Sequence, residues 1–348
     1  MNSAGSRFTF VDLFAGIGGF HIGLKAVGGQ CLLANEWNKY AAVTYRSWTG
    51  SDRLVEGDIW SLIESGYKFP KADVLSAGFP CQPFSLAGVS KKNSLGRAHG
   101  FDDVEQGNLF FAITDVMKRI EPKVVLLENV KNLISHDRGN TWTVIQDSLN
   151  KLGYGVQRSV IDAAGWVPQH RERVFIVAMK RRTFTSAEID GFEFPKVPCD
   201  GPRMISVLEP NPDPKYMLSD ALWGYLRSYA EKHRRKGNGF GFGLVGPDDI
   251  SRTLSARYYK DGSEILVRQP GWRNPRRLTP NEAARLMGFD SHFAHEQGFD
   301  DRFPIDVSDS QSYKQLGNSV SPYVVRAVGE EIARVLDQRR CRSDKRIR

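Results

Sequence analysis

The sequence contains little cysteine. Its 348 residues include four cysteines, which are widely spaced and form no Cys-x-x-Cys pair. This spacing excludes a disulfide-stabilised scaffold and argues against a zinc finger, so we expect no metal. No apolar run approaches the ~20 residues that a membrane-spanning helix requires. Residues 1–9 lack a basic stretch followed by an apolar one, so we expect no secretory signal and a location in the cytosol.

Positive charge is in excess but unevenly distributed. The net charge is +8, from 48 Lys and Arg against 40 Asp and Glu. Residues 1–177 carry +2, residues 178–278 carry +6, residues 279–337 carry −5 and residues 338–348 carry +5. A basic balance weakly indicates a polyanionic partner, and here the charge is concentrated in a middle segment and a short tail. The tail fits either non-specific attraction to nucleic acid or a disordered, solubilising end.

The first 180 residues alternate strand-like and helix-like segments. Such alternation is typical of right-handed βαβ units, which build a sheet with helices on both faces. We therefore predict an α/β fold with a doubly wound, mostly parallel sheet. Its strands are expected over residues 8–13, 31–35, 74–77, 124–127, 160–163 and 174–178, and its helices over 17–26, 39–48 and 109–120.

The pattern changes after Met179. Prolines and then glycines interrupt residues 195–246, which predicts a smaller, loop-rich second domain. A helical pattern returns after Leu278, with Pro280 near a helix start, and residues 321–338 read as a final helix before a frayed end. The predicted organisation is a domain over 1–179, a second over 180–275, a return to the first over 276–337, and a basic tail over 338–348.

A glycine-rich turn follows the first predicted strand, in the sequence from Asp12 to Phe20 (DLFAGIGGF). Glycines between a buried strand and a helix allow a ligand to approach the helix N-terminus, although a purely structural tight turn has the same pattern. Glu36 and Asp58 stand at the ends of the next two strands. An acid after the second strand typically binds ribose hydroxyls, and Asp58 is suited to an adenine amino group. The three together indicate a nucleoside-type cofactor.

Two reactive side chains are expected at the same sheet edge. Cys81 lies among two prolines and a glycine (GFPCQPFS) after a predicted strand, so its thiol is placed in a loop where it becomes a nucleophile if its neighbours favour the thiolate. Glu128 ends an apolar strand, so partial desolvation should favour its protonated form and general-acid catalysis. The structural alternatives are an inert core cysteine and a helix-capping or ion-paired glutamate.

Arg171 and Arg173 precede another predicted strand, in the sequence QHRER. Alternate residues of a strand share a face, so we expect both guanidinium groups to project together toward an oxygen or a phosphate. A surface charge pair is the alternative interpretation.

In this order, the four motifs resemble the DNA (cytosine-5)-methyltransferase family over about residues 8–335. PCQPFS resembles its catalytic motif, and ENV (128–130) and QHRER its two cytosine-pocket motifs. Residues 277–289 and 315–320 (QLGNSV) are similar to its last two motifs. The amino-acid sequence of residues 237–241 and 253–266 is similar to that of the bacterial Dcm-like branch, whose members methylate the inner cytosine of CC(A/T)GG.

The resemblance implies a Rossmann-like, class I S-adenosylmethionine-dependent methyltransferase. Cys81 would add to carbon 6 of cytosine, Glu128 would act at ring N3, Asn129 would hold Glu128 or the Cys81 loop, and Arg171 and Arg173 would hold the cytosine O2 and nearby phosphates. Trp37 would stack on adenine. The cofactor residues carried over are Phe14, Gly16, Gly18, Glu36, Trp37, Asp58, Ile59, Leu109 and Asn318.

The resemblance also implies double-stranded DNA as partner, with the cytosine flipped out of the duplex. Residues 85–106 would close over the DNA as a lid, with Ser85, Lys91, Lys92 and Arg97 as DNA contacts. The candidates for reading guanines in the major groove are Arg252, Arg257, Lys260 and Arg268. We expect a monomer in the cytoplasm, associated with the nucleoid; a cognate restriction endonuclease remains open.

Other interpretations compete with this one. The tRNA-methylating branch shares several motifs. However, the recognition segment of roughly 100 residues and its Dcm-like sequence favour DNA as the substrate. A non-catalytic DNA-binding relative is disfavoured by the presence of Cys81 and Glu128. A nicotinamide-dependent oxidoreductase would suit the fold, but it would not account for PCQ beside ENV.

Overall fold

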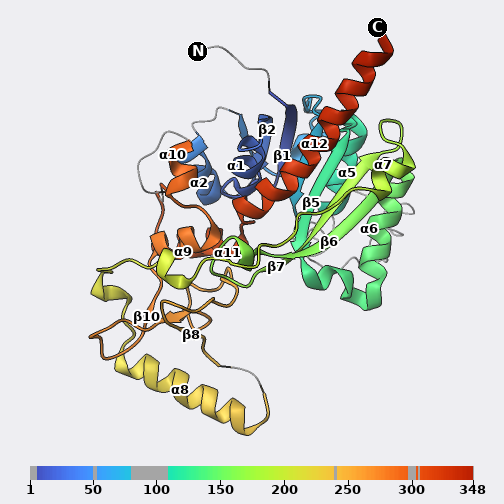
Figure 1. Ribbon diagram of the computed structural model, residues 1–348. Coiled ribbons are helices and arrows are strands. Elements are labelled where there is room, and N and C mark those ends of the chain that lie inside the picture. Colours follow the sequence, from blue (N-terminus) through green and yellow to red (C-terminus); the bar gives the residue numbers. More distant parts are fainter. Residues whose placement is uncertain are drawn as a thin grey trace.

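A seven-stranded sheet forms the centre of the larger part of the protein. The computed structural model describes residues 6–49, 53–79, 109–238, 241–296, 303–304 and 306–347. The strand order is β3-β2-β1-β4-β5-β7-β6, so β1 and β4 lie side by side at the centre (Figure 1). The strands are β1 (Phe8–Leu13), β2 (Gly29–Glu36), β3 (Leu54–Glu56), β4 (Val74–Gly78), β5 (Val124–Val130), β6 (Tyr154–Asp162) and β7 (Glu172–Lys180).

Helices cover both faces of this sheet. Because alternate strand residues point to opposite faces, Phe8 and Phe10 of β1 enter one core, and Val11 and Leu13 enter the other. The first core is closed by α1 and α12, and the second by α5 and α6 (Figure 1), together with Ile59 and Ile63 of α3. The helices of this part are α1 (Gly19–Lys25), α2 (Lys39–Thr49), α3 (Ile59–Glu64), α5 (Leu109–Ile120), α6 (Asn140–Lys151), α7 (Ser186–Asp190) and α12 (Pro322–Ile347).

The sheet is mostly parallel, as predicted, and β7 is the exception. It runs antiparallel to β5 on one side and to β6 on the other. The first residues of β7 therefore lie at the edge where β4 and β5 end, with Arg173 opposite Val130 and Gly78 opposite Glu128. The described residues of the ENV and QHRER motifs therefore meet at this edge, and β4, which leads toward Cys81, ends there as well.

A smaller sheet and a long helix form the second part of the molecule. The sheet has the order β10-β9-β8, with strands β8 (Leu244–Val245), β9 (Leu266–Val267) and β10 (Arg276–Arg277). Helix α8 (Asp220–Arg235) packs on it through Leu226 and lies at the end of the molecule away from α12 (Figure 1). The prediction of a loop-rich segment overlooked this helix. The Ser219 side chain caps it by accepting a hydrogen bond from the Leu222 backbone N–H.

The chain then returns to the large sheet through α9 (Pro280–Met287), α10 (Ser291–Glu296), α11 (Asp309–Asn318) and α12. The prediction of a frayed end after residue 338 is wrong, because α12 continues to Ile347. Its last turns are held by ion pairs, with Arg342 2.5 Å from Glu188 and Arg340 3.7 Å from Asp73. Figure 1 places this end of α12 on the side of the molecule opposite α8.

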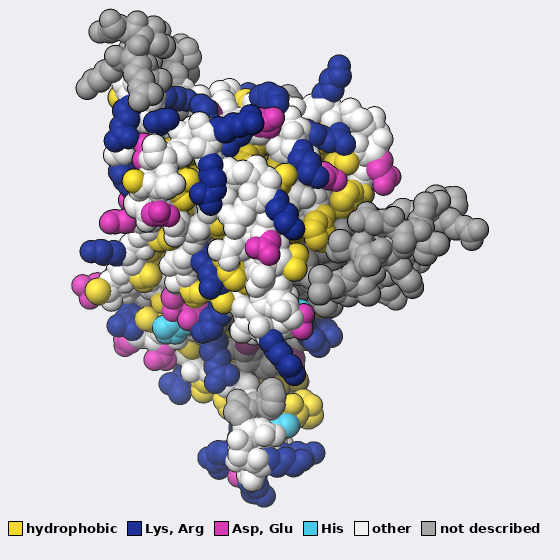
Figure 2. Space-filling view, turned by 90° about the vertical axis from the view of Figure 1, so that its right-hand side faces the viewer, with side chains coloured by type: hydrophobic (Ala, Val, Ile, Leu, Met, Phe, Trp, Pro, Cys, Tyr) yellow, Lys and Arg dark blue, Asp and Glu magenta, His cyan; other side chains and the backbone are white. Residues whose placement is uncertain are grey.

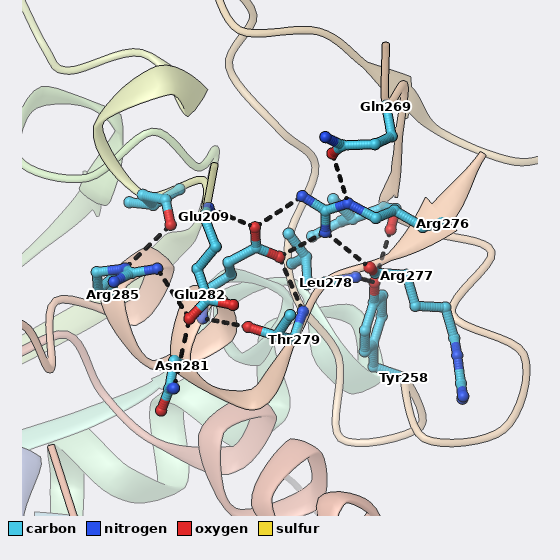
Figure 3. A network of polar contacts seen from close by, with 12 residues as sticks. Glu209, Tyr258, Gln269, Arg276, Arg277, Leu278, Thr279, Asn281, Glu282 and Arg285 are labelled. Carbon is cyan, nitrogen blue, oxygen red and sulfur yellow. Dashed lines mark hydrogen bonds and ion pairs between the residues drawn. The ribbon is translucent and has the colours of Figure 1, made fainter. Parts of the chain in front are cut away.

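A buried ion pair joins the small sheet to α9 (Figure 3). Arg276 and Glu282 are both fully buried, and their two hydrogen bonds measure 2.7 and 2.8 Å. Gln269 also accepts a hydrogen bond from Arg276, while the Glu282 carboxylate accepts from the backbone N–H groups of Thr279 and Glu209. Every oxygen and nitrogen of this pair therefore has a partner, as a buried charge requires.

Glu282→Gln is expected to lower the free energy of unfolding by about 3–5 kcal/mol, because the buried Arg276 charge loses its counter-ion. Urea denaturation followed by tryptophan fluorescence measures the change. The matched control is Glu209→Gln in the same network, where the carboxylate is 22% exposed and 3.4 Å from Arg285. This control should lose less than about 1 kcal/mol. Equal losses of unfolding free energy in the two variants would show that the buried ion pair contributes no more to stability than the partly exposed one.

Candidate active site

The turn between β1 and α1 leaves open space beside its backbone. Phe14 and Gly16 both have left-handed backbone conformations, with φ of 56° and 57°. A Cβ on Gly16 would have no atom within 4 Å, whereas a Cβ on Gly18 would lie 2.6 Å from the Trp48 ring. Gly18 is therefore required by packing, and Gly16 presents an open edge that a ligand can approach. A strained non-glycine residue such as Phe14 is typical of a functional site.

Glu36 fixes this turn from the end of β2. One carboxylate oxygen accepts a hydrogen bond from the Gly16 backbone N–H at 2.8 Å, and the other accepts from the Asn38 N–H at 2.7 Å. Burial raises the pKa of Glu36, and these N–H groups counteract the rise. Each carboxylate oxygen has a second lone-pair direction, so the side chain retains acceptor capacity for a ribose hydroxyl.

The neighbouring cofactor candidates surround the same strand ends. The Trp37 side chain is 70% exposed, although it follows the buried Glu36 directly. Asp58 caps α3, with its carboxylate accepting a hydrogen bond from the Ser61 N–H at 2.8 Å. The backbone N–H of Gly57 donates to the Glu36 carbonyl, which holds the Asp58 segment beside β2. Of the remaining candidates, Ile59 is buried at the start of α3 and Leu109 is partly buried at the start of α5.

The last motif lies against the glycine-rich turn. A Cβ on Gly19 would come within 2.5 Å of the Val320 carbonyl oxygen, so these two segments are in direct contact. Thr44 of α2 donates a hydrogen bond to Gln315 of α11 at 2.9 Å. Asn318, the last residue of α11, is exposed beside this contact. Residues more than 270 positions apart in the sequence are thus brought to one place.

Glu128 is the carboxylate at the centre of the sheet edge. Its side chain is 12% exposed, and one oxygen lies 3.0 Å from Nε of Arg173. The other oxygen lies next to Gly78, the last residue of β4. Burial raises the pKa of Glu128, while the charges of Arg173 and Arg171 limit the rise. Burial thus shifts this carboxyl toward its protonated form relative to an exposed glutamate, which is the direction that proton donation to a substrate requires.

Asn129 connects this strand to the segment that leads to Cys81. Its side-chain amide donates a hydrogen bond of 2.7 Å to the carbonyl of Phe79, and its own oxygen accepts from the Val130 N–H. Asn129 is buried, so both groups are satisfied within the protein. Of the two roles expected for Asn129, the geometry supports holding the chain ahead of Cys81.

Arg171 lies near Arg173 and Glu128, whose charges act on its pKa, but its terminal nitrogens bond groups of the protein itself. It precedes β7 and is buried, and its two terminal nitrogens donate hydrogen bonds to the carbonyls of Leu254, Gly317 and Ser319 at 2.7–3.0 Å. The side chain therefore joins the second part of the molecule to the last motif. Its terminal donors bond protein carbonyls, while its buried Nε has no hydrogen-bond partner among the described residues.

Two further residues belong to this region, although sequence reasoning gave them no role. Gln169 is fully buried and donates to the Leu286 carbonyl while accepting from the Leu254 N–H at 2.7 Å. His170 is exposed, and its Nδ1 lies 2.8 Å from Asp162. The available signal was the motif QHRER itself, in which only the arginines were given a role.

The structure does not test every candidate. Cys81, Ser85, Lys91, Lys92 and Arg97, with the predicted lid over residues 85–106, lie outside the described residues. The four candidate base-reading residues are exposed, namely Arg252, Arg257, Lys260 and Arg268. Arg268 directly follows β9, where its backbone N–H donates to the Val245 carbonyl. Their contacts with DNA remain predictions.

Comparison with known proteins agrees with this geometry. The C-5 cytosine-specific DNA methylase family matches residues 8–334. The chain is 42% identical to the DNA-cytosine methyltransferase of Escherichia coli K12, in an alignment that covers 93% of this chain and 77% of the relative. It is 43% identical to the type II methyltransferase M.NlaX of Neisseria lactamica, covering 94% and 97% respectively.

Solved structures show the same fold at lower identity. The Dnmt2 methyltransferase of S. pombe superimposes with a TM-score of 0.67 at 19% identity, covering 95% of this chain and 98% of that one. A putative DNA modification methyltransferase from an E. coli prophage superimposes with a TM-score of 0.64 at 21% identity, covering 94% and 99%.

The fold and the sheet-edge site thus define a methyltransferase of the Rossmann-like type. The chain belongs to the C-5 cytosine-specific DNA methylase family. It is a DNA (cytosine-5)-methyltransferase, and S-adenosylmethionine is its methyl donor. In the described part of the chain, none of the helices has both the length and the apolar character needed to cross a bilayer.

Proposed function

We propose that the protein methylates carbon 5 of a flipped-out cytosine within a short palindromic duplex site that contains CC and GG, similar to CC(A/T)GG. The observation that carries the chemistry is Glu128, buried at the end of β5, paired with Arg173 and next to the strand that leads to Cys81. The similarity of residues 237–241 and 253–266 to Dcm-like sequences supports the target. Type II methyltransferases among the relatives support a role beside a restriction endonuclease.

The residues perform the reaction in stages. The Cys81 thiolate adds to carbon 6 of cytosine, and the displaced electron density is neutralised as Glu128 donates its proton to ring N3. Arg173 stabilises the negative charge that develops on the ring. When bound, S-adenosylmethionine would supply the methyl group that carbon 5 accepts, and S-adenosylhomocysteine would be the leaving group. The carbon 5 hydrogen then leaves as a proton to solvent, the electron pair of that bond re-forms the ring double bond and expels Cys81 as the thiolate, and N3 returns its proton to Glu128.

The cofactor site suits an adenosyl group on the observations above. Gly16 offers an open backbone edge, Glu36 offers acceptors for ribose hydroxyls, and the Trp37 indole is exposed for stacking on adenine. Asp58 lies between β3 and α3, and Asn318 is the last residue of α11. We assign the cofactor to the carboxyl ends of β1, β2 and β3 on this basis.

Trp37→Ala is expected to weaken S-adenosylmethionine binding by roughly 5- to 150-fold, because aromatic stacking on a base contributes about 1–3 kcal/mol. Isothermal titration without DNA measures the change. Tyr229→Ala in α8 is the control, since this exposed aromatic residue lies in the other part of the molecule. Unchanged affinity in the Trp37 variant would remove the indole from the cofactor site.

Methylation assays test the function and its target together. Bisulfite sequencing of host DNA after expression should show 5-methylcytosine at one short sequence containing CC and GG. Methyl transfer to tRNA but not to duplex DNA would instead favour the alternative substrate. DNA that carries 5-fluorocytosine at the target should trap a covalent complex when cofactor is present, because fluorine cannot leave as a proton does. No trapped complex would overturn the covalent step.

The proposal includes the larger organisation of the chain. Residues 1–179 and 276–337 form the catalytic and cofactor-binding part, and residues 180–275 form the target-recognition part. A single copy holds both parts, so we propose a monomer that works at the nucleoid. Residues 85–106 serve as the lid over the DNA, and the four exposed basic residues Arg252, Arg257, Lys260 and Arg268 serve as candidates for reading bases.

A further inference from the structure

Helix α8 presents a face that no other described element covers. Leu226 is its one buried residue, and Leu222 and Trp223 join it against the small sheet. Tyr225 and Tyr229 are 60% and 39% exposed, and their ring centroids are 6.0 Å apart. Two adjacent tyrosines left in solvent on a helix surface indicate a contact surface rather than a packed core.

Positive charge continues this stripe toward the end of the helix. Lys232 and Lys236, the C-cap residue directly after α8, are exposed and follow Tyr225 and Tyr229 at helical spacing, which places the four residues along one side of the helix. Glu231 is already shared between Arg234 and Arg235, which leaves the end of the helix with a net positive charge. Figure 2 shows Lys and Arg side chains around the narrow lower end of the molecule, where Figure 1 places α8.

We propose that the exposed face of α8, defined by Tyr225, Tyr229, Lys232 and Lys236, binds the phosphate backbone of duplex DNA outside the methylated site. This inference rests on the duplex DNA substrate of the proposed function. Lysine and tyrosine side chains are common donors to phosphate oxygens, and such contacts carry no sequence preference. The 16-residue helix is about 24 Å long, which corresponds to roughly 7 base pairs of duplex.

The position of α8 in the molecule favours binding to DNA that flanks the methylation site over binding to the site itself. The candidate base-reading residues lie in the segment from Arg252 to Arg268, which includes β9. Helix α8 packs on the small sheet through Leu226, while its tyrosines lie in solvent. In Figure 1 the helix lies at the far end of the molecule from α12, beyond the small sheet. A duplex seated on the recognition segment would have to extend past its target to reach this face.

The test compares two double variants with the same change in charge. The first is Lys232→Ala with Lys236→Ala. The control is Lys68→Ala with Lys151→Ala, two exposed lysines that precede β4 and β6, at the sheet edge opposite the active site. Each protein is titrated with a target-bearing duplex of about 12 base pairs and with one of about 30 base pairs, over a range of salt concentrations. Methylation of both duplexes is measured in parallel.

The α8 variant should bind the long duplex roughly 10-fold more weakly, with a salt slope reduced by about 2, while its kcat and its affinity for the short duplex stay unchanged. Wild-type behaviour on the long duplex would overturn the inference, as would an equal loss on both duplexes or an equal loss in the control. If the wild-type protein methylated neither duplex, the proposed function would fail first. If the wild-type protein methylated DNA but the α8 variant kept an unchanged salt slope, the role of the α8 surface would be refuted while the proposed function would stand.

Discussion

Cys81→Ser should abolish methyl transfer, with a loss on the order of 10³-fold or more, while duplex DNA still binds. A serine hydroxyl is far less ionised than a thiol, so it cannot add to carbon 6 at a useful rate. Asn129 holds the Phe79 carbonyl two residues ahead of Cys81, and the substitution leaves that contact intact. Tritium transfer from labelled cofactor measures turnover, and gel shift measures binding.

Cys341→Ser is the matched control for this experiment. Cys341 is an exposed free thiol near the end of α12, and α12 carries it away from the sheet edge that holds Glu128 (Figure 1). The control should keep wild-type turnover and covalent trapping by 5-fluorocytosine DNA, and the Cys81 variant should lose both. Substantial turnover in the Cys81 variant would sink the assignment of the nucleophile.

Glu128→Gln is expected to lower kcat by roughly 10²- to 10⁴-fold, the usual contribution of a general acid. Glutamine has nearly the same shape but cannot deliver a proton to ring N3. Glu172→Gln provides the comparison, because Glu172 lies at the start of β7 but is exposed and pairs with Lys131. If Glu172→Gln keeps the wild-type kcat while Glu128→Gln loses it, the loss is due to the carboxyl group of Glu128. Similar losses in both would point to a general electrostatic effect.

The pH profile gives an independent measure of Glu128. Burial raises the pKa of its carboxyl, so the protonated, active form persists at a higher pH than for an exposed glutamate. The wild-type kcat should therefore fall as the pH rises through this pKa. The residual activity of Glu128→Gln should lack this decline, since glutamine does not titrate. The same alkaline decline in the variant would assign it to another group.

Local sequence pattern predicted the central sheet well. The strand over 8–13 and the helix over 109–120 have the predicted bounds, because a buried strand is a short apolar run and α5 has a clear apolar face. Strand β6 starts six residues before the predicted one, since its first residues mix polar and apolar side chains. The reversed direction of β7 could not be predicted, because hydrophobicity does not encode strand direction.

Long-range contacts explain the other failures. Helix α8 was overlooked because proline- and glycine-rich stretches flank it and its apolar face is narrow. The end of α12 is helical, with ion pairs to Glu188 and Asp73 from distant segments. Arg171 was expected to face a substrate, but its partners are carbonyls 83 to 148 residues away. Motif spacing locates such a residue without showing where its donors point.

The Arg171 contacts have a consequence for how target preference can diverge. All three of its acceptors are main-chain carbonyls, which any amino acid supplies, so the hydrogen bonds themselves set no requirement on the side chains at positions 254 and 319. Gly317 is different, since a Cβ there would come within 2.3 Å of the backbone at Ser255 and Ala256. A recognition segment transplanted from a relative should therefore keep the Arg171 contacts if it carries an apolar residue in the buried position of Leu254, provided that Gly317 is kept and the backbone follows the same course.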